Sequence, residues 1–354
     1  MKICILGDTH FGARGDSLDF HRYFQKFYEN ILFPYLEENN IKTIFQMGDL
    51  FDRRKFINFN SLFLARKYFF DEIVANDITM YTLIGNHDMA FKNTLEVNSP
   101  SLVINDYKNV KVIQNFTTIG LGDTLIDVVP WICDENKNDI IKKIKSSKSD
   151  ICFGHFEIMG FEMERGSICE TGIDKKILSR YDVVLSGHFH HKSTQGNITY
   201  VGTPYEMTWS DFNDVKGFHI FDTETRTLEF TANPYTMFNK IIYDDSETNF
   251  EFWKAYEYDK HANTYVKVVV VNKQNPYLFD NVIDNLYKAS CADIAIVEDF
   301  TDTRIEDEIV DQAEDTMTIL SKFIDALELD VENDKLKKVM RELYVEALNT
   351  EVTD

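Results

Sequence analysis

Cysteine is scarce in this chain of 354 residues, and its pattern excludes two classes of site. The five cysteines are scattered, and no two of them stand in a Cys-x-x-Cys arrangement. An odd number without such spacing argues against a disulfide framework and against a zinc site built from thiolates. A reducing, cytoplasmic environment is therefore the expected location.

Long apolar runs are also missing. The longest candidate, residues 265–271, contains a lysine and falls well short of the roughly 18 to 20 residues that span a bilayer. The chain reaches Asp8 after only a few apolar positions, which is too short for the apolar core of a secretory signal. We therefore expect a soluble protein that makes no use of a membrane and is not exported.

Positive charge is in short supply. The chain has 37 Lys and Arg against 59 Asp and Glu, which gives a net charge of -22. Residues 299–334 alone hold 13 acidic and 2 basic side chains, so this segment carries -11, half of the total. A surface of this sign repels nucleic acid unless metal ions or a partner intervene. Any proposal of DNA binding has to account for that charge.

The apolar fraction of 44% is enough for a sizeable core and, at roughly 150 residues per domain, for two or three domains. Short β-rich runs alternate with helical spacing in the first two thirds of the chain, which predicts a layered α/β fold. The runs are residues 2–6, 43–47, 79–84, 151–153 and 183–185, and the helical segments are residues 18–39 and 60–76. Residues 265–271, 276–288 and 294–297 predict a strand, a helix and a strand of a smaller α/β unit.

Two amphipathic stripes lie near the end of the chain, one within residues 316–327 of the acidic segment and one within residues 335–348 directly after it. Two short helices of this kind cannot bury their apolar stripes against each other alone. They dock either on a partner or on this chain's own domain. The residues that we expect at such a contact are Leu320, Ile324, Leu327, Leu336, Val339 and Leu343.

Polar clusters follow five of the predicted strands. They are Asp8-Thr9-His10, Gly48-Asp49-Leu50-Phe51-Asp52, Gly85-Asn86-His87-Asp88, Gly154-His155 and Gly187-His188-Phe189-His190. The carboxyl ends of strands in an open α/β sheet face a common crevice, so we expect these groups to converge. A Gly-Asp pair alone is ordinary turn chemistry, and His155 alone is typical of a structural histidine. The joint pattern favours a functional site.

The ligand types in these clusters are imidazoles and carboxylate or amide oxygens, without a thiolate, which suits manganese, iron or zinc. Two cations roughly 3.5 to 4 Å apart need a bridging carboxylate, and they hold and activate a hydroxide nucleophile. This chemistry predicts direct hydrolysis of a phosphoester without a covalent enzyme intermediate.

The ordered set Asp-x-His, Gly-Asp-x-x-Asp, Gly-Asn-His-Asp, Gly-His and Gly-His-x-His resembles the calcineurin-like metallophosphoesterase superfamily. Within it, the sequences around Asp8 and Asp49 are similar to the double-strand-break repair nuclease branch, which includes SbcD-like and T-even phage subunits. The protein phosphatase branch has Gly after Asp-Arg, where this chain has Arg54. If a phage encodes the chain, its expected location is the host cytoplasm.

The resemblance implies a role for each matching residue. One ion would be held by Asp8, His10, Asp49 and His190, and the other by Asp49, Asn86, His155 and His188. His87 would stabilise the phosphate or protonate the leaving oxygen, with Asp88 orienting its ring. Asp52 would contact a metal-ligating residue rather than a metal ion. Arg53 and Arg54 would contact phosphates of DNA or belong to a solvated loop.

The resemblance also implies the architecture and the partners. We expect a β-sandwich flanked by helices in residues 1–235, a small α/β capping domain in 236–300, and an acidic linker with a helix-loop-helix in 301–354. The expected function is a manganese-dependent, or alternatively magnesium-dependent, DNA endonuclease and 3′-5′ exonuclease. It would act as a homodimer with a coiled-coil ATPase of the SMC type, the SbcC type in bacteria, in recombination, replication and double-strand-break repair. The alternative is a stand-alone metallophosphoesterase for phosphomonoesters or cyclic nucleotides.

Overall fold

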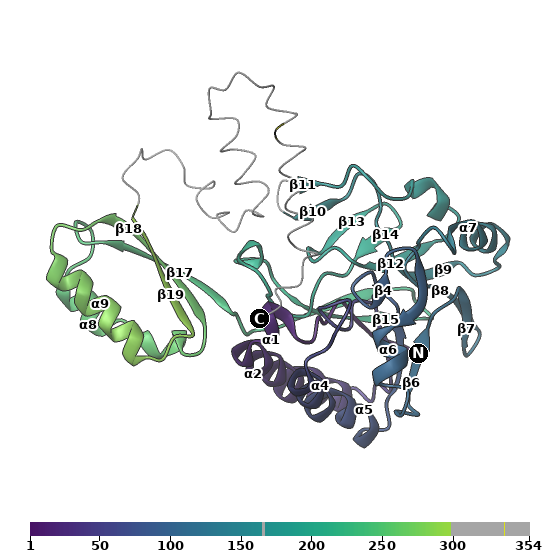
Figure 1. Cartoon of the computed structure of the whole chain (residues 1–354), viewed down its shortest axis with the longest axis horizontal. Helices are drawn as coiled ribbons and strands as arrows, with labels where there is room; N and C mark the ends of the chain where they lie inside the picture. The colour runs from purple at the N-terminus through teal and green to yellow at the C-terminus, as the bar shows by residue number, and fades with distance from the viewer. Residues whose placement is uncertain (165–166, 299–335, 337–354) are drawn as a thin grey trace. The chain divides into compact units, whose positions relative to one another are not determined.

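The computed structural model describes residues 1–164, 167–298 and 336 (Figure 1). It divides into two compact units, and the elements below all belong to the first, which comprises Met1–Met207 and Asp211–Asp299. The predicted C-terminal helix-loop-helix lies outside the described residues, except for Leu336, which is helical. None of the described helices has the length and apolar character needed to cross a bilayer.

The first large sheet has six strands in the order β16-β15-β1-β2-β3-β6. Neighbouring strands from β1 to β6 run parallel, whereas β15 is antiparallel to both β1 and β16. The strands are β1 (Lys2–Leu6), β2 (Thr43–Gln46), β3 (Thr79–Leu83), β6 (Val110–Ile113), β15 (Gly217–Asp222) and β16 (Leu228–Ala232). This arrangement directs the carboxyl ends of β1, β2 and β3 to one edge of the sheet.

The second large sheet also has six strands, in the order β13-β14-β12-β9-β8-β7. Its central strands β8, β9, β12 and β14 are parallel, and an antiparallel strand closes each side. The strands are β7 (Thr117–Leu121), β8 (Thr124–Val129), β9 (Ile151–His155), β12 (Val183–Gly187), β13 (Ser193–Gln195) and β14 (Ile198–Tyr200).

The two sheets pack against each other around a shared apolar core. Phe45 of β2 and Phe153 of β9 meet there with their ring centroids 5.1 Å apart in an edge-on arrangement. Ile3 and Ile5 of β1 belong to the same buried cluster as Leu185 of β12. The predicted β-sandwich is therefore confirmed, and its parallel strands are apolar on both sides because helices cover the outer faces.

Helices cover the first sheet, and two of the predicted long helices are interrupted by wider π-helical turns. The segment predicted at 18–39 consists of α2 (Leu18–Phe27), a π turn (Tyr28–Leu32) and α3 (Phe33–Glu38). The segment predicted at 60–76 consists of α4 (Phe59–Ala65), a π turn (Arg66–Phe70) and α5 (Asp71–Ala75). The remaining helices before residue 150 are α1 (Ala13–Asp16), α6 (Ser99–Val103) and α7 (Lys137–Ser146).

A smaller parallel sheet with two helices follows residue 237. Its order is β17-β18-β19, and the helices pack on it through Trp253 and Val282, which share a buried cluster with Val268. The elements are β17 (Phe238–Asp244), α8 (Phe250–Ala255), β18 (Tyr265–Asn272), α9 (Pro276–Lys288) and β19 (Asp293–Glu298). Two-stranded ribbons are formed by β4 (Met89–Phe91) with β5 (Thr94–Asn98), and by β10 (Glu162–Glu164) with β11 (Ser167–Ile168).

A buried carboxylate holds the chain where it enters the smaller sheet. Glu206 is 3% exposed, and its Oε2 accepts the backbone N–H groups of Met237 and Phe238 at 2.6 and 2.9 Å. Burial raises the pKa of Glu206 to about 7. The pKa of this residue in the unfolded chain is near 4.5. Between pH 4.5 and pH 7 the folded chain therefore keeps a proton on Glu206 that the unfolded chain has released.

Glu206→Gln is expected to remove this pH dependence while an amide oxygen still accepts both N–H groups. In wild type, the buried charge of Glu206 lowers the free energy of unfolding in full above pH 7, and this effect disappears as the pH falls to 4.5. The variant should therefore have a higher free energy of unfolding than wild type only at the higher pH. The difference should reach about 3 kcal/mol, from 1.36 kcal/mol per pKa unit. Urea unfolding of both proteins at pH 4.5 and pH 8 measures it; a difference that does not change with pH would contradict the assignment.

Candidate metal centre

The five polar clusters follow strands β1, β2, β3, β9 and β12, which come from both large sheets. Asp8 and His10 follow β1, Asp49 follows β2, and Asn86 follows β3. His155 ends β9, and His188 follows β12. The strand ends meet at the same edge of the sandwich, so residues that are far apart in sequence lie within a few ångströms of one another, as the sequence predicts.

Two glycines are required because other parts of the site approach them closely. A Cβ atom on Gly48 would lie 2.4 Å from the His155 Nδ1 atom, and one on Gly85 would lie 2.2 Å from Asp49 Oδ1. Real Cβ contacts of this length do not occur, and Gly48 also has a left-handed φ of +102°. The Gly-Asp and Gly-Asn pairs are thus not merely turn residues, because each glycine makes room for a side chain of the site.

Three of the predicted ligands have left-handed backbone conformations. The φ angles are 42° at His10, 51° at Asp49 and 89° at His188. Non-glycine residues rarely adopt such angles, which cost of order 1–3 kcal/mol each and persist where the surrounding structure imposes them. Other non-glycine residues of the chain, such as Asn40 and Asp77, also have positive φ, so this conformation accompanies the site without marking it by itself.

Asp8, His10 and His190 form the first candidate ligand group, with one ligand atom of each within 4.8 Å of the others. The Nε2 atoms of His10 and His190 face each other at 3.1 Å. The Asp8 carboxylate also accepts the backbone N–H of His188, at 3.0 and 3.2 Å from its two oxygens. This contact fixes the carboxylate beside the loop that carries both His188 and His190.

Asp49, His155 and His188 form a second group by the same criterion. The Nε2 atom of His155 lies 3.1 Å from Oδ1 of Asn86 and 3.3 Å from Oδ2 of Asp49. Its Nδ1 atom lies 2.7 Å from the Met47 carbonyl oxygen, which therefore accepts a hydrogen bond from the ring. A proton on Nδ1 leaves Nε2 with a free lone pair directed at the site, which is the tautomer that a metal ligand needs.

Asp49 lies between the two groups. Its Oδ2 atom is 3.3 Å from Nε2 of His155 in one group and 3.9 Å from Nε2 of His10 in the other. Its Oδ1 atom accepts the backbone N–H of His87 at 2.7 Å, which fixes the orientation of the carboxylate. One oxygen facing both groups is the position that a bridging ligand of two cations requires.

The buried carboxylates of the site are stabilised by nearby positive charge. Burial alone would lower the pKa of His10 and His155, but the neighbouring carboxylates raise each to about 9. Burial raises the pKa of Asp8 to about 7, whereas for Asp49 the nearby histidines, His155 above all, outweigh burial and lower the pKa. Without metal, protons on histidines supply the positive charge that these buried carboxylates need. Imidazoles and carboxylates in this arrangement fit divalent metal ions.

His87 stands beside both groups, and its ring is oriented by a different residue from the one predicted. Its Nδ1 atom donates to the backbone carbonyl oxygen of Asp52 at 2.6 Å. The Asp88 carboxylate instead accepts the N–H groups of Leu50, Phe51 and Gly85, at 3.0, 3.2 and 2.9 Å. The expected contact between Asp88 and the His87 ring was wrong: adjacent residues of a turn point in different directions, and Asp88 fixes the backbone of the turns themselves.

The side chains of Asp52, Arg53 and Arg54 contact different parts of the structure. Asp52 Oδ1 lies 3.4 Å from Nδ1 of His10, so it stands behind that histidine. Arg53 forms an ion pair with Asp16 at 3.3 Å, whereas Arg54 lines an apolar groove beside α4. These positions leave the predicted phosphate contacts of the two arginines untested.

Sequence reasoning missed two residues next to the site. Lys216 is 4% exposed, and its Nζ atom lies 2.6 Å from Asp211 and 2.7 Å from Asp214 while it donates to the His190 carbonyl at 2.8 Å. The indole of Trp131 lies against His188, with ring centroids 4.9 Å apart. Nothing in the sequence distinguishes Lys216 from a solvated lysine or Trp131 from a core aromatic residue, because neither stands in a motif.

Comparisons with known proteins show which proteins the chain is similar to. The chain is 33% identical over 354 residues, 98% of its length and 99% of the other's, to exonuclease subunit 1 of Enterobacteria phage T4. It is 24% identical over 160 residues, 43% of its length and 41% of the other's, to the SbcD subunit of the nuclease SbcCD of Staphylococcus epidermidis. A solved archaeal phosphodiesterase aligns at 14% identity and a TM-score of 0.33, over 66% of this chain and 100% of that one. The family model described as calcineurin-like phosphoesterase matches residues 1–192, and the chain belongs to this family of metallophosphoesterases.

Proposed function

We propose that this protein is the nuclease subunit of a DNA-processing complex and hydrolyses phosphodiesters with two divalent ions, manganese above all. The position of Asp49 carries this proposal, because a single carboxylate oxygen faces His155 at 3.3 Å and His10 at 3.9 Å. The nearly full-length similarity to a phage exonuclease subunit supports DNA as the substrate, with endonuclease and 3′-5′ exonuclease activity as the specific proposal.

The proposed ligands divide between two ions. One ion would use Asp8, His10, Asp49 and His190, and the other would use Asp49, Asn86, His155 and His188. When bound, the ions supply the positive charge that neutralises phosphate oxygens and activates water for attack. The protein's own contribution is to fix the donors before substrate arrives, through the N–H groups donated to Asp8 and Asp49 and the Met47 carbonyl that holds His155.

His87 would act on the substrate itself. Its Nδ1 proton is committed to the Asp52 carbonyl, so a second proton, on Nε2 of the imidazolium form, would be the one donated to a phosphate or to the departing 3′ oxygen. The ring also packs edge-on against His10 with centroids 4.8 Å apart, which sets its position relative to the first ligand group. General acid catalysis of this kind contributes about 10²–10⁴-fold to a rate.

His87→Ser is expected to lower cleavage of DNA by about 10²–10⁴-fold while the protein still binds manganese. The measurement is a nuclease assay of wild type and variant with manganese and with magnesium, together with calorimetric titration of manganese. Full activity in the variant would remove His87 from the reaction. Absence of DNA cleavage by wild type with either metal, alongside turnover of phosphomonoesters or cyclic nucleotides, would replace the nuclease proposal with the stand-alone phosphoesterase.

The chain is also proposed to work with a coiled-coil ATPase of the SMC type. Both relatives named as nucleases are subunits by name, which implies partners for them. We propose that residues 301–354 bind the ATPase through Leu320, Ile324, Leu327, Leu336, Val339 and Leu343, and that residues 236–300 form a capping domain beside the nuclease domain of residues 1–235. A partner would also compensate for the net charge of -22 in binding DNA.

An apolar surface on α4 and α6 supports the proposed homodimer. Phe59 is 89% exposed and Leu102 is 71% exposed, and both line a groove of about 230 Å³ with Phe56. Phe63, one turn after Phe59, is also exposed. Clustered large apolar side chains of this kind mark interfaces, and a two-fold contact would bury the same surface of each copy.

Phe59→Lys is expected to convert the dimer to a monomer because it would place a charge inside this contact. Light scattering after size exclusion should give twice the chain's 41.3 kDa for wild type and 41.3 kDa for the variant. Phe252→Lys, at a half-exposed position on α8, is the control and should leave the dimer intact. A monomeric wild type, or a dimer that tolerates Phe59→Lys, would contradict this surface.

A further inference from the structure

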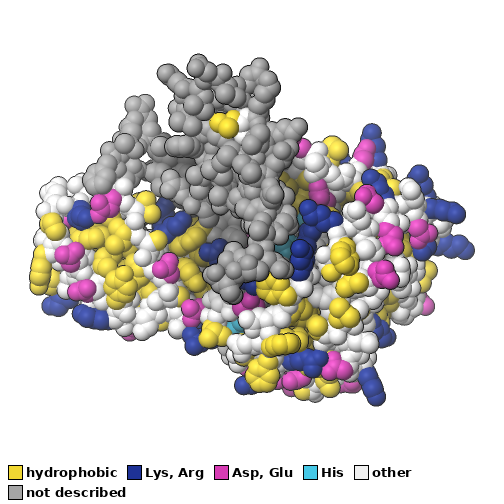
Figure 2. Space-filling model, viewed as in Figure 1, with side chains coloured by type: hydrophobic (Ala, Val, Ile, Leu, Met, Phe, Trp, Pro, Cys, Tyr) yellow, Lys and Arg dark blue, Asp and Glu magenta, His cyan; other side chains and the backbone are white. Residues whose placement is uncertain are grey.

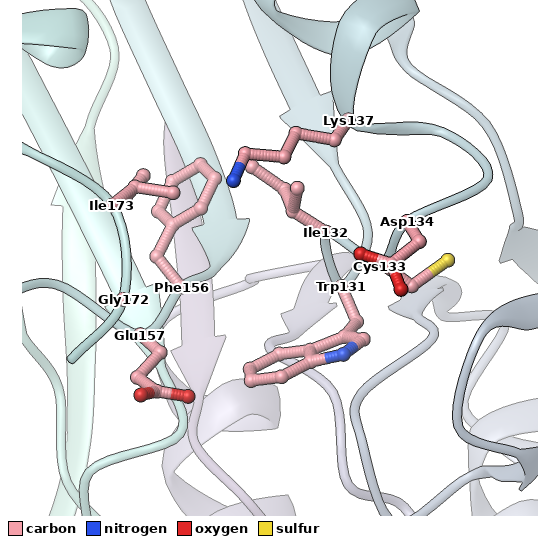
Figure 3. A pocket seen from close by; sticks show the side chains of 9 residues that line it. All are labelled: Trp131, Ile132, Cys133, Asp134, Lys137, Phe156, Glu157, Gly172 and Ile173. Atoms are coloured by element: carbon pink, nitrogen blue, oxygen red, sulfur yellow. The ribbon is translucent and has the colours of Figure 1, made fainter.

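Figure 3 shows a slot of about 210 Å³, one of whose residues, Trp131, also packs against His188 of the candidate metal centre. One wall is formed by Trp131 and by Lys137 at the start of α7, and the other by Phe156, Glu157 and Ile173. Figure 3 shows the Lys137 amine directed toward the Phe156 ring and the Glu157 carboxylate directed toward the indole of Trp131. The slot is thus lined by the aromatic side chains of Trp131 and Phe156 and by three charged side chains, those of Lys137, Asp134 and Glu157.

Trp131 separates this slot from the proposed ligands. Its ring centroid lies 4.9 Å from that of His188 and 5.8 Å from that of His155. The same indole therefore packs on two histidines of the second ligand group and lines the slot. A molecule whose phosphate lies at the metal centre can reach the slot by extending past one side chain.

The charged groups of the slot are differently constrained. Within the described part of the chain, Lys137 takes part in none of the ion pairs, and its side chain is exposed. Glu157 is half-buried, and its Oε1 accepts a hydrogen bond from the Thr171 hydroxyl. One donor and one fixed acceptor beside an aromatic face are the groups that bind the edge and the face of a nucleobase.

We propose that this slot binds the nucleobase next to the scissile phosphate, with Trp131 stacking on the base, and Lys137 and Glu157 contacting its edge. The proposal rests on the proposed nuclease function and specifies how the substrate is held. Stacking on an aromatic ring is tolerant of sequence, since every base has a π face, so the slot would accept any of the four bases. The slot binds a flipped or single-stranded base, because a paired base inside a duplex does not present its face.

The surroundings of the slot suit an approaching nucleic-acid strand. Helix α7, which begins at Lys137, contains four lysines and a single acidic residue. Figure 2 shows lysine and arginine side chains, with aspartate and glutamate side chains between them, along the side of the molecule that carries α7. On a chain of net charge -22, the sequence of α7 is a local exception, and the helix begins at a residue of the slot.

The test compares single-stranded oligonucleotides that are intact or that lack one base next to the cleaved phosphate. Wild type in manganese should show a KM about tenfold or more higher for the abasic strand, because stacking on it is lost. Trp131→Ala, Lys137→Ala and Glu157→Gln should raise the KM for the intact strand and reduce the discrimination against the abasic strand. Lys142→Ala, which removes a charge from α7 outside the slot, should keep that discrimination.

A second readout does not depend on turnover. An oligonucleotide with 2-aminopurine at the same position should lose fluorescence when it binds the His87→Ser protein. The double variant His87→Ser, Trp131→Ala should not cause this loss. If wild type cleaves DNA but treats intact and abasic strands alike, the slot proposal is wrong and the nuclease proposal stands. If Lys142→Ala and Lys137→Ala have equal effects, only charge is involved and the slot proposal is also overturned. If wild type does not cleave DNA at all, both proposals fail.

Discussion

Asp49→Asn is expected to lower phosphodiesterase activity by about three orders of magnitude. The carboxylate faces both ligand groups, so the amide removes the negative charge that the two proposed ions would share. Metal ions contribute several kcal/mol of transition-state stabilisation, and about 4 kcal/mol corresponds to a factor of 10³. Initial rates on DNA with saturating manganese measure the loss, and calorimetry should give two manganese ions per wild-type chain and at most one for the variant.

Asp52→Asn is the matched comparison for this result. It makes the same chemical change in a carboxylate that does not lie between the ligand groups. The Asp52 carboxylate lies 3.4 Å from Nδ1 of His10. Substitution of a residue that orients a metal ligand lowers activity by about 10- to 100-fold. The activity of Asp52→Asn should therefore fall between those of wild type and Asp49→Asn. Equal effects of the two substitutions would mean that Asp49 is not a bridge.

Lys216→Met is expected to destabilise the protein by about 3 to 5 kcal/mol, because it leaves the carboxylates of Asp211 and Asp214 without their shared buried cation. The same change removes the donor to the His190 carbonyl, so the loop that carries His190 should loosen. Calorimetric melting and urea unfolding measure the stability. A weaker affinity for manganese should accompany the loss.

Lys143→Met serves as the control, because Lys143 pairs with Asp139 at 2.7 Å on the exposed surface of α7. Exposed pairs of this kind contribute about 0.3–0.5 kcal/mol, so its melting curve should nearly match that of wild type. If Lys216→Met behaved like Lys143→Met, the buried cluster around Lys216 would not stabilise the fold, and its contact with the His190 loop would be incidental.

The strand ends and the convergence of the polar clusters are predictable because they follow from local patterns. A run such as residues 2–6 is apolar throughout after its first residue, and the structure buries it as β1 between helices and the second sheet. Parallel strands of one sheet end at the same edge, so Asp8, Asp49 and Asn86 have to meet once these strands are assigned. The resemblance of the motifs to metallophosphoesterases follows from the same residues, and membership of that family is confirmed.

The contacts between side chains and backbone are less predictable, since they depend on how turns are directed in three dimensions. The ring of His87 binds the carbonyl of Asp52, and no side-chain pattern reports the direction of a carbonyl group. Lys216 is buried by the loop of its two aspartate partners, and its sequence neighbourhood resembles that of any surface lysine. Helical spacing alone predicts an unbroken helix at residues 60–76, whereas the structure has a π turn at Arg66–Phe70.

The two sheets each provide only part of the proposed donor set, since Asp8, Asp49 and Asn86 come from one and His155 and His188 from the other. A chain in which the sheets have not yet docked therefore has no complete coordination sphere for either ion. Cations that bind only the finished sandwich should favour it by mass action, so the melting temperature should rise with free manganese concentration. Occupancy by metal would then report the completion of folding, which couples the protein's stability to the supply of its cofactor.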